Sequence, residues 1–147
     1  MFHYKIVRHC LMTFEIVGEF VRDIDRNCKF CRTQPETIQH LLWDCPIVQI
    51  FIRNVNAAIM ENYPLYYSHW NKRNFIFSDQ GSNILLPHNI FALYLKYYLW
   101  MTRCNEEMPF IEGFCRFFNF EINIIKTAFR QKSAIDRLKC INLDNLN

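Results

Sequence analysis

The sequence predicts a mainly α-helical domain of about five helices. Over most of the chain, apolar residues recur every three to four positions, as they do on the buried face of a helix. Only 3 of the 147 residues are glycine, which leaves little material for the tight turns of β architectures. Hydrophobic residues make up 51% of the chain and charged residues 21%, which is the composition of one folded domain rather than of a disordered tail.

Two helices are predicted in the N-terminal third. The first covers residues 6–22, where Gly18 weakens or bends it. Its apolar face consists of Ile6, Val7, Leu11, Phe14, Val17 and Val21. A short second helix follows Pro35, which suits the first helical turn, and Glu36 lies where the helix dipole favours an acid.

Pro46 separates this short helix from the next one, because it disfavours the α conformation at Cys45 and is itself well placed to begin a helix. The apolar face of that helix consists of Ile47, Val48, Phe51, Val55, Ala58 and Ile59. Residues 75–77 are expected to be extended. Two strongly apolar helices follow, over residues 88–103 and from 109 to about 132.

These elements form one domain over residues 1–133, and residues 134–147 are expected to be a poorly ordered polar tail. The most apolar stretch, residues 84–101, contains His88, Asn89 and Lys96. It therefore falls short of the roughly 18 uncharged residues that a membrane span requires. Residues 1–22 lack the unbroken apolar region of a signal peptide. We expect an intracellular protein of the nucleus or cytoplasm, neither secreted nor bound to a membrane.

Three cysteines and one histidine form a C-x2-C-x8-H-x4-C array: Cys28, Cys31, His40 and Cys45. A C-x2-C turn presents two thiolates to one ion, and the turn at Pro46 lets a helical imidazole and a following thiolate converge on it. Four such ligands predict one structural Zn²⁺, because a closed shell leaves no position for a reactive water. The domain is thus expected to be organised around a CCHC zinc knuckle at residues 28–45, with a helical remainder at 46–133.

The other interpretation of Cys28 and Cys31 is a thioredoxin-like redox pair. That motif follows a strand and opens a helix, whereas here a polar, turn-like stretch over residues 23–27 precedes it. The remaining cysteines have no ligand spacing: Cys10, Cys104, Cys115 and Cys140. Cys115 lies beside the Phe-rich face of the last helix and is expected to be buried.

Residues 27–49, NCKFCRTQPETIQHLLWDCPIVQ, resemble the zinc-binding domain found C-terminal to the reverse transcriptase of non-LTR (LINE-like) retrotransposons. The resemblance extends less specifically to about residue 130 and not beyond about Ser133. Carried over position by position, it places the family's zinc ligands on Cys28, Cys31, His40 and Cys45. It implies a domain that helps a parent polymerase to hold RNA or DNA, and a chain that is a separated piece of a larger polyprotein.

Catalytic motifs are absent from the sequence. The six aspartates are never adjacent, whereas reverse transcriptases carry an Asp-Asp pair for two-metal nucleotidyl transfer. There is also no P-loop, no G-x-S-x-G elbow and no H-E-x-x-H pair. We expect a non-enzymatic domain without a small-molecule substrate.

Two groups of residues are candidates for nucleic-acid binding. Around the first ligand pair stand Arg26, Lys29 and Arg32, with the ring of Phe30 as a platform for unpaired bases and Trp43 as another. The second group is Lys126, Arg130 and Arg137, which a continuous helix would align on one face. Alternatively, Phe30 only covers the zinc sulfurs, Trp43 belongs to the core, and the C-terminal cations form a solvated helix end.

Two functions follow. The first is a zinc-stabilised, non-catalytic domain with weak nucleic-acid binding, acting with a parent reverse transcriptase. The alternative is a structural or protein-interaction domain, in which zinc only ties helices together and the chain is a relic without activity of its own.

Overall fold

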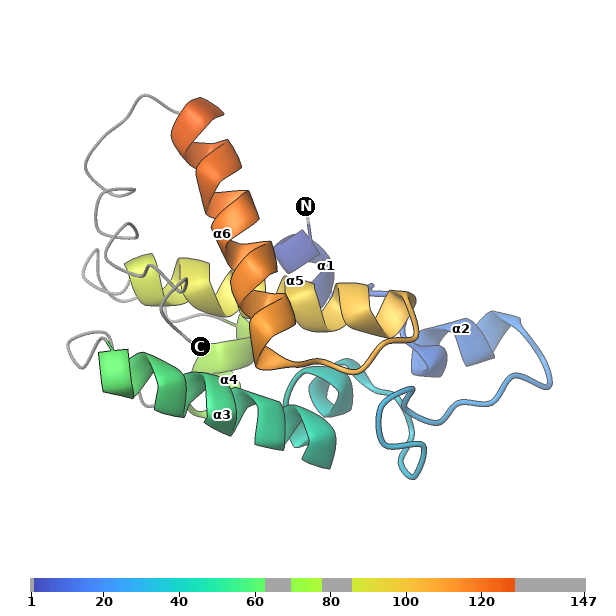
Figure 1. The fold of residues 1–147 in the computed structure, drawn as a ribbon. Coiled ribbons are helices and arrows are strands. Elements are labelled where there is room, and N and C mark those ends of the chain that lie inside the picture. Colours follow the sequence, from blue (N-terminus) through green and yellow to red (C-terminus); the bar gives the residue numbers. More distant parts are fainter. Residues whose placement is uncertain (1, 63–69, 78–85, 129–147) are drawn as a thin grey trace.

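The computed structural model describes residues 2–62, 70–77 and 86–128. The described part contains six α-helices, one π-helix and no strand (Figure 1). The α-helices are α1 (Phe2–Val7), α2 (Phe14–Phe20), α3 (Pro46–Asn62), α4 (Lys72–Phe77), α5 (Leu86–Cys104) and α6 (Ile111–Ala128). The π-helix η1 covers His40–Asp44, and an isolated bridge pairs Asn27 with Pro35. The mainly helical fold class is confirmed.

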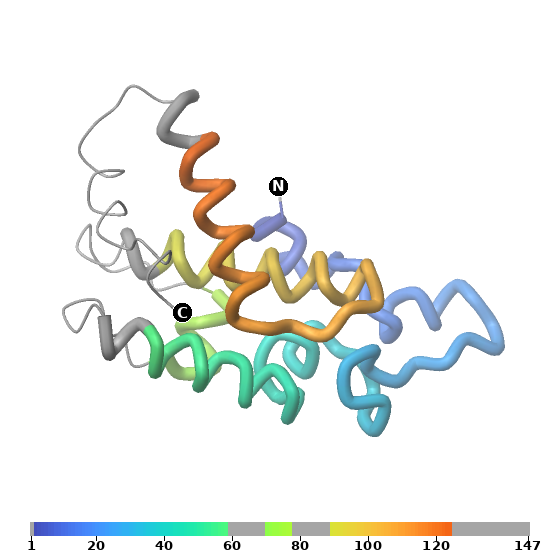
Figure 2. The backbone as a smooth tube through the Cα atoms, viewed as in Figure 1, coloured from blue at the N-terminus to red at the C-terminus, as the bar shows by residue number. Residues whose placement is uncertain are grey.

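The long helices α3, α5 and α6 form the helical body. Helix α6 packs against both α3 and α5, and the short α4 contacts α5, η1 and α1. In Figure 1, α2 and the chain that follows it lie to one side of this body. The backbone trace in Figure 2 shows the same segment, in blue, running out from the body and returning to it.

An aromatic cluster fills the helical body. Phe114 of α6 is fully buried and meets Phe91 of α5 edge to face, with ring centroids 5.4 Å apart. Its ring also contacts Phe51 of α3 at 6.2 Å and Tyr98 of α5 at 5.5 Å. Phe118, one turn along α6, contacts Phe91 at 5.0 Å. The three helices thus share one core made largely of interlocking rings.

The helix expected over residues 6–22 is in fact two helices, α1 and α2, separated by residues 8–13. The break does not fall at Gly18, which lies inside α2. It falls at His9, whose φ of 51° is left-handed and ends α1, while the Cys10 N–H donates to the Lys5 carbonyl. Helical periodicity continues across this break, so the sequence pattern does not reveal it.

The extended segment expected at residues 75–77 is also wrong, because these residues end the helix α4. A reciprocal pair of hydrogen bonds starts this helix. The Asn71 N–H donates to the Asn74 side chain, and the Asn74 N–H donates to the Asn71 side chain. This arrangement is a capping box built from two asparagines.

The C-terminal helices agree with the sequence pattern. Helix α3 begins at Pro46 as expected, α5 covers the apolar stretch around residues 88–103, and α6 begins at Ile111, close to Pro109. The end of the last predicted helix and the predicted tail at 134–147 lie outside the described residues. Among the described residues, no helix is both long and apolar enough to span a membrane.

Candidate metal centre

Four side chains from two neighbouring parts of the chain meet at one point: Cys28, Cys31, His40 and Cys45. Their ligand atoms all lie within 4.8 Å of one another. Cys28 and Cys31 belong to a tight turn in which the Arg32 N–H donates to the Cys28 carbonyl at 2.8 Å. Cys31 is half-buried, and the other three side chains are buried. The array recognised in the sequence is therefore a cluster that could hold a metal ion.

The π-helix explains how His40 and Cys45 reach the same point. Five residues correspond to about 1.4 turns of an α-helix, so in a regular helix these two side chains would face different directions. In η1, the Cys45 N–H instead donates to the His40 carbonyl at 2.9 Å, which is the five-residue bond of a π-turn. At the other end, the Thr37 hydroxyl accepts the His40 N–H at 2.9 Å and fixes the start of the turn.

Two distances within the cluster are close to those of a tetrahedral zinc site. Two sulfurs bound at about 2.3 Å from one zinc ion stand about 3.8 Å apart, and a sulfur and an imidazole nitrogen about 3.6 Å. The Sγ atoms of Cys28 and Cys45 are 3.9 Å apart, and Cys31 Sγ lies 3.3 Å from His40 Nε2. Three sulfurs and one imidazole nitrogen are also the donor set that Zn²⁺ prefers in structural sites.

Two of the thiols influence each other's acidity. The hydrogen bond between Cys28 and Cys45, together with burial, raises the pKa of Cys28. The same hydrogen bond lowers the pKa of Cys45. Cys28 therefore holds its proton more strongly than Cys45 does, and a divalent cation must displace that proton to bind both sulfurs.

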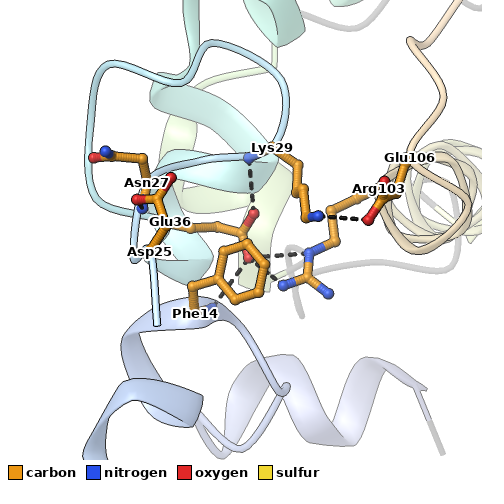
Figure 3. A network of polar contacts seen from close by, with 7 residues as sticks. All are labelled: Phe14, Asp25, Asn27, Lys29, Glu36, Arg103 and Glu106. Atoms are coloured by element: carbon orange, nitrogen blue, oxygen red, sulfur yellow. Dashed lines mark hydrogen bonds and ion pairs between the residues drawn. The ribbon is translucent and has the colours of Figure 1, made fainter. Parts of the chain in front are cut away.

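A buried carboxylate supports the turn that carries Cys28 and Cys31 (Figure 3). Glu36 is fully buried, and its Oε2 accepts the Lys29 N–H at 3.2 Å. Its Oε1 accepts the Phe14 N–H at 3.1 Å and two hydrogen bonds from the Arg103 guanidinium, at 2.6 and 3.0 Å. One side chain thus joins the first ligand pair to α2 and to the end of α5.

This role of Glu36 differs from the one expected from the sequence. The helix after Pro35 begins at Ile38 and continues as η1, so Glu36 precedes its first turn. Its partner Arg103 is 67 residues away in the sequence, and no local pattern connects the two. The only signal in the sequence is an acidic residue placed between two pairs of ligands.

Cations and an aromatic ring surround this network. The Arg103 guanidinium lies 4.4 Å from the centroid of the Phe14 ring and 5.0 Å from that of Trp100. Lys29 Nζ lies 5.4 Å from the Phe14 ring and forms an ion pair with Glu106 at 2.6 Å. The contacts of Phe14 and Arg103 hold α2 against the end of α5.

Of the first group of predicted nucleic-acid residues, Lys29, Phe30 and Arg32 line one hollow together with Glu106 and Glu107, whereas Arg26 contacts α2. Arg26 donates to the Gly18 carbonyl at 2.5 Å, Lys29 is paired with Glu106, and Arg32 is exposed. Phe30 is only 6% exposed and packs in the core with Cys28, which leaves little of its ring for a base. This burial favours the alternative interpretation, in which Phe30 covers the sulfurs, and the stacking role stays a prediction.

Trp43 is half-buried, with its ring 5.2 Å from that of Phe75, as a core residue would be. The second predicted group lies mostly outside the described residues. Lys126 belongs to α6, but its side chain is not among those described, and Arg130 and Arg137 lie outside the described residues. Of the other cysteines, Cys115 is buried as expected, Cys10 and Cys104 are exposed, and Cys140 lies outside the described residues.

Comparisons with known proteins give no relative: no family model, no curated protein and no solved structure matches this chain.

Proposed function

We propose that this chain is a zinc-binding, non-catalytic helical domain in which one Zn²⁺ holds residues 28–45 together. The observation that carries the proposal is the convergence of Cys28, Cys31, His40 and Cys45 within 4.8 Å. Three thiolates and a neutral imidazole favour zinc over the hard cations magnesium and calcium, which prefer oxygen ligands. Four protein ligands complete the tetrahedral shell, and a complete shell supports a structural role.

Metal content tests this proposal directly. Native mass spectrometry of the full chain, purified with zinc, should give one ion per chain. Cys31→Ser and His40→Ala should each lose the ion and melt at a lower temperature, because the binding free energy of a structural metal is also folding free energy. Cys104→Ser, which changes an exposed cysteine outside the cluster, is the matched control. Retention of one tightly bound zinc by both ligand variants would refute the site.

We further propose that the domain assists the RNA or DNA binding of a parent polymerase. Two observations support this. Residues 27–49 resemble the zinc-binding domain of non-LTR retrotransposon reverse transcriptases, and Arg32 is exposed next to the ligand Cys31. In addition, residues 126–147 carry five Lys or Arg against two Asp or Glu. Such cations bind phosphates without reading sequence, so the binding is expected to be salt-dependent.

The alternative function, a protein-interaction domain, has its own supporting observation. A groove of about 310 Å³ lies between the start of α3 and the start of α6. Its lining is mostly apolar and includes Ile50 and Phe110, which are 51% and 45% exposed. The ion pair between Lys29 and Glu106 also neutralises one cation beside the metal centre, which favours this alternative.

Fluorescence anisotropy with single-stranded RNA and DNA at two salt concentrations separates the two functions. If the domain binds nucleic acid, Arg32→Gln should weaken binding and reduce the salt slope by about 0.7, the value for one phosphate contact on a single strand. Arg53→Gln, at an exposed arginine on α3, is the control. No salt-dependent binding at micromolar protein would exclude the nucleic-acid function and leave the interaction domain.

A further inference from the structure

Lys96 of α5 is a lysine placed in the core. The residue is fully buried, and its Nζ donates to the Ile76 carbonyl at 3.0 Å. Nζ also lies 5.8 Å from the centroid of the Phe75 ring. Among the described residues, no carboxylate lies within ion-pair distance of this ammonium group. A buried charge without a counterion is costly, and burial lowers the pKa of Lys96 to about 8.

His3 of α1 is the other polar group that reaches Lys96. Its Nδ1 lies 3.5 Å from Lys96 Nζ, and the two residues are 93 positions apart in the sequence. Burial, and then the charge of Lys96, lower the pKa of His3. An imidazole nitrogen accepts a hydrogen bond only when it carries no proton, so this contact requires the neutral ring.

Helices α1, α4 and α5, which carry or contact the pair, contain no Asp or Glu, and α6, which packs against α5, carries Glu112 and Glu121. Besides His3, α1 carries one basic side chain, Lys5, which is exposed, as is Arg8 just beyond the helix. Helix α4 faces the pair with the Phe75 ring and the Ile76 carbonyl, while its Lys72 is paired with Asp44. His9 contacts the ring of Phe77 instead. Met1 and Asp79 lie outside the described residues.

We propose that α1 is a pH-sensitive latch, which is docked on α4 and α5 while His3 is neutral and is released when His3 is protonated. Protonation removes the acceptor at Nδ1 and places a second cation 3.5 Å from the Lys96 ammonium. The other contacts that hold α1, on α4 and α5, include apolar ones that do not titrate: Ile6 is buried, and Phe2 meets Tyr97 edge to face at 5.2 Å.

The direction of the pH effect follows from the lowered pKa of His3. The docked state lowers the pKa of His3 below its ordinary value of 6.5. The contact between His3 and Lys96 therefore stabilises the docked state fully above pH 6.5. This stabilisation is lost as the pH falls below that value. The latch does not depend on the proposed metal function, because neither residue belongs to the metal centre.

Nuclear Overhauser contacts between the rings of Phe2 and Tyr97 report docking in the zinc-loaded full chain. In the wild type they should be present at pH 7.5 and lost at pH 5.5. His3→Gln cannot be protonated and keeps an amide acceptor, so it should retain the contacts at both values. His9→Gln, on the same segment but away from Lys96, should behave as the wild type.

Zinc content is measured in the same samples. Because His3→Gln leaves the metal centre unchanged, a difference between it and the wild type cannot arise from loss of the ion. Lys96→Met removes the charge repulsion but not the burial that lowers the pKa of His3, so its contacts should be lost at a lower pH than in the wild type; if that variant fails to fold, His3→Gln decides alone. Contacts that persist in the wild type at pH 5.5, or that disappear in His3→Gln as they do in the wild type, would overturn the latch.

Discussion

Residues 14–36, called here the outer segment, and the helical body of α3, α5 and α6 are held in place by different interactions. The body is filled by buried rings, among them Phe91, Phe114 and Phe118. Within the outer segment, the only buried hydrophobic side chains are Cys28 and Phe30. Its contacts with the rest of the chain are instead those of two cysteines of the candidate metal centre, one buried carboxylate and the cation over the Phe14 ring.

The π-helix η1 joins these two regions. Leu41 and Leu42 are fully buried in the core with the body, while His40 and Cys45 at its two ends face the cysteines of the outer segment. The body can therefore form by hydrophobic burial alone. The outer segment buries too little apolar surface to do so, and a bound metal would supply the missing stabilisation.

The largest expected effect is on the body. Phe114→Ala removes a fully buried ring and should lower the free energy of unfolding by about 3–5 kcal/mol. Urea denaturation measures it, and zinc stoichiometry under native conditions should stay at that of the wild type. Phe120→Ala, at a ring that is 64% exposed on the same helix, should change stability by less than about 0.5 kcal/mol. Equal effects of the two variants would contradict the assignment of the core.

The second-largest expected effect is the loss of the ion pair between Glu36 and Arg103, which links the outer segment to the body. Arg103→Met leaves the Glu36 carboxylate fully buried without its cation, and should cost about 3 kcal/mol. Calorimetry and a zinc competition assay should show lower stability together with weaker zinc binding, because the same carboxylate holds the Lys29 N–H.

Adding Glu36→Gln to Arg103→Met removes the unpaired charge and should recover part of the lost stability. An Arg103→Met variant that binds zinc as tightly as the wild type would show that the network does not support the metal centre.

Substitutions at two glycines, Gly113 in the body and Gly18 in the outer segment, test how tightly each region is packed. A Cβ at Gly113 of α6 would clash with the hydroxyl of buried Tyr98 and with the Phe110 ring, whereas one at Gly18 of α2 would meet the flexible side chain of Arg26. Gly113→Ala should therefore destabilise by about 1–2 kcal/mol. At Gly18, the clash and the gain in helix propensity of about 1 kcal/mol roughly offset each other. Thermal melts measure both variants, and a lower melting temperature for Gly18→Ala than for Gly113→Ala would contradict the expected difference.

The smallest expected effect is a gain in stability rather than a loss. The hydroxyl of Thr13 is buried and has no hydrogen-bond partner among the described residues. Thr13→Val keeps the β-branched shape and removes that polar group, so it should raise the free energy of unfolding by about 1 kcal/mol. A lower stability in chemical denaturation would mean that the hydroxyl has a partner, such as a bound water.

The body was more predictable from the sequence than the outer segment, for a physical reason. Helices α3, α5 and α6 follow from apolar spacing and from Pro46, which are local signals. The ligand set was also local, and its four residues do converge. The break at His9 and the π-turn at His40 were not predicted, because neither disturbs the apolar pattern. The bond between Glu36 and Arg103 joins distant parts of the chain, and only the tertiary structure brings them together.

Hydrogen–deuterium exchange with and without a zinc chelator, at one pH, shows whether a bound ion holds the outer segment in place. Removal of the ion should abolish the protection of amides in residues 14–36, including the Phe14 and Lys29 N–H groups that donate to Glu36. Amides of α3, α5 and α6 should remain protected. Unchanged exchange in residues 14–36, or loss of protection throughout the helical body, would contradict the account.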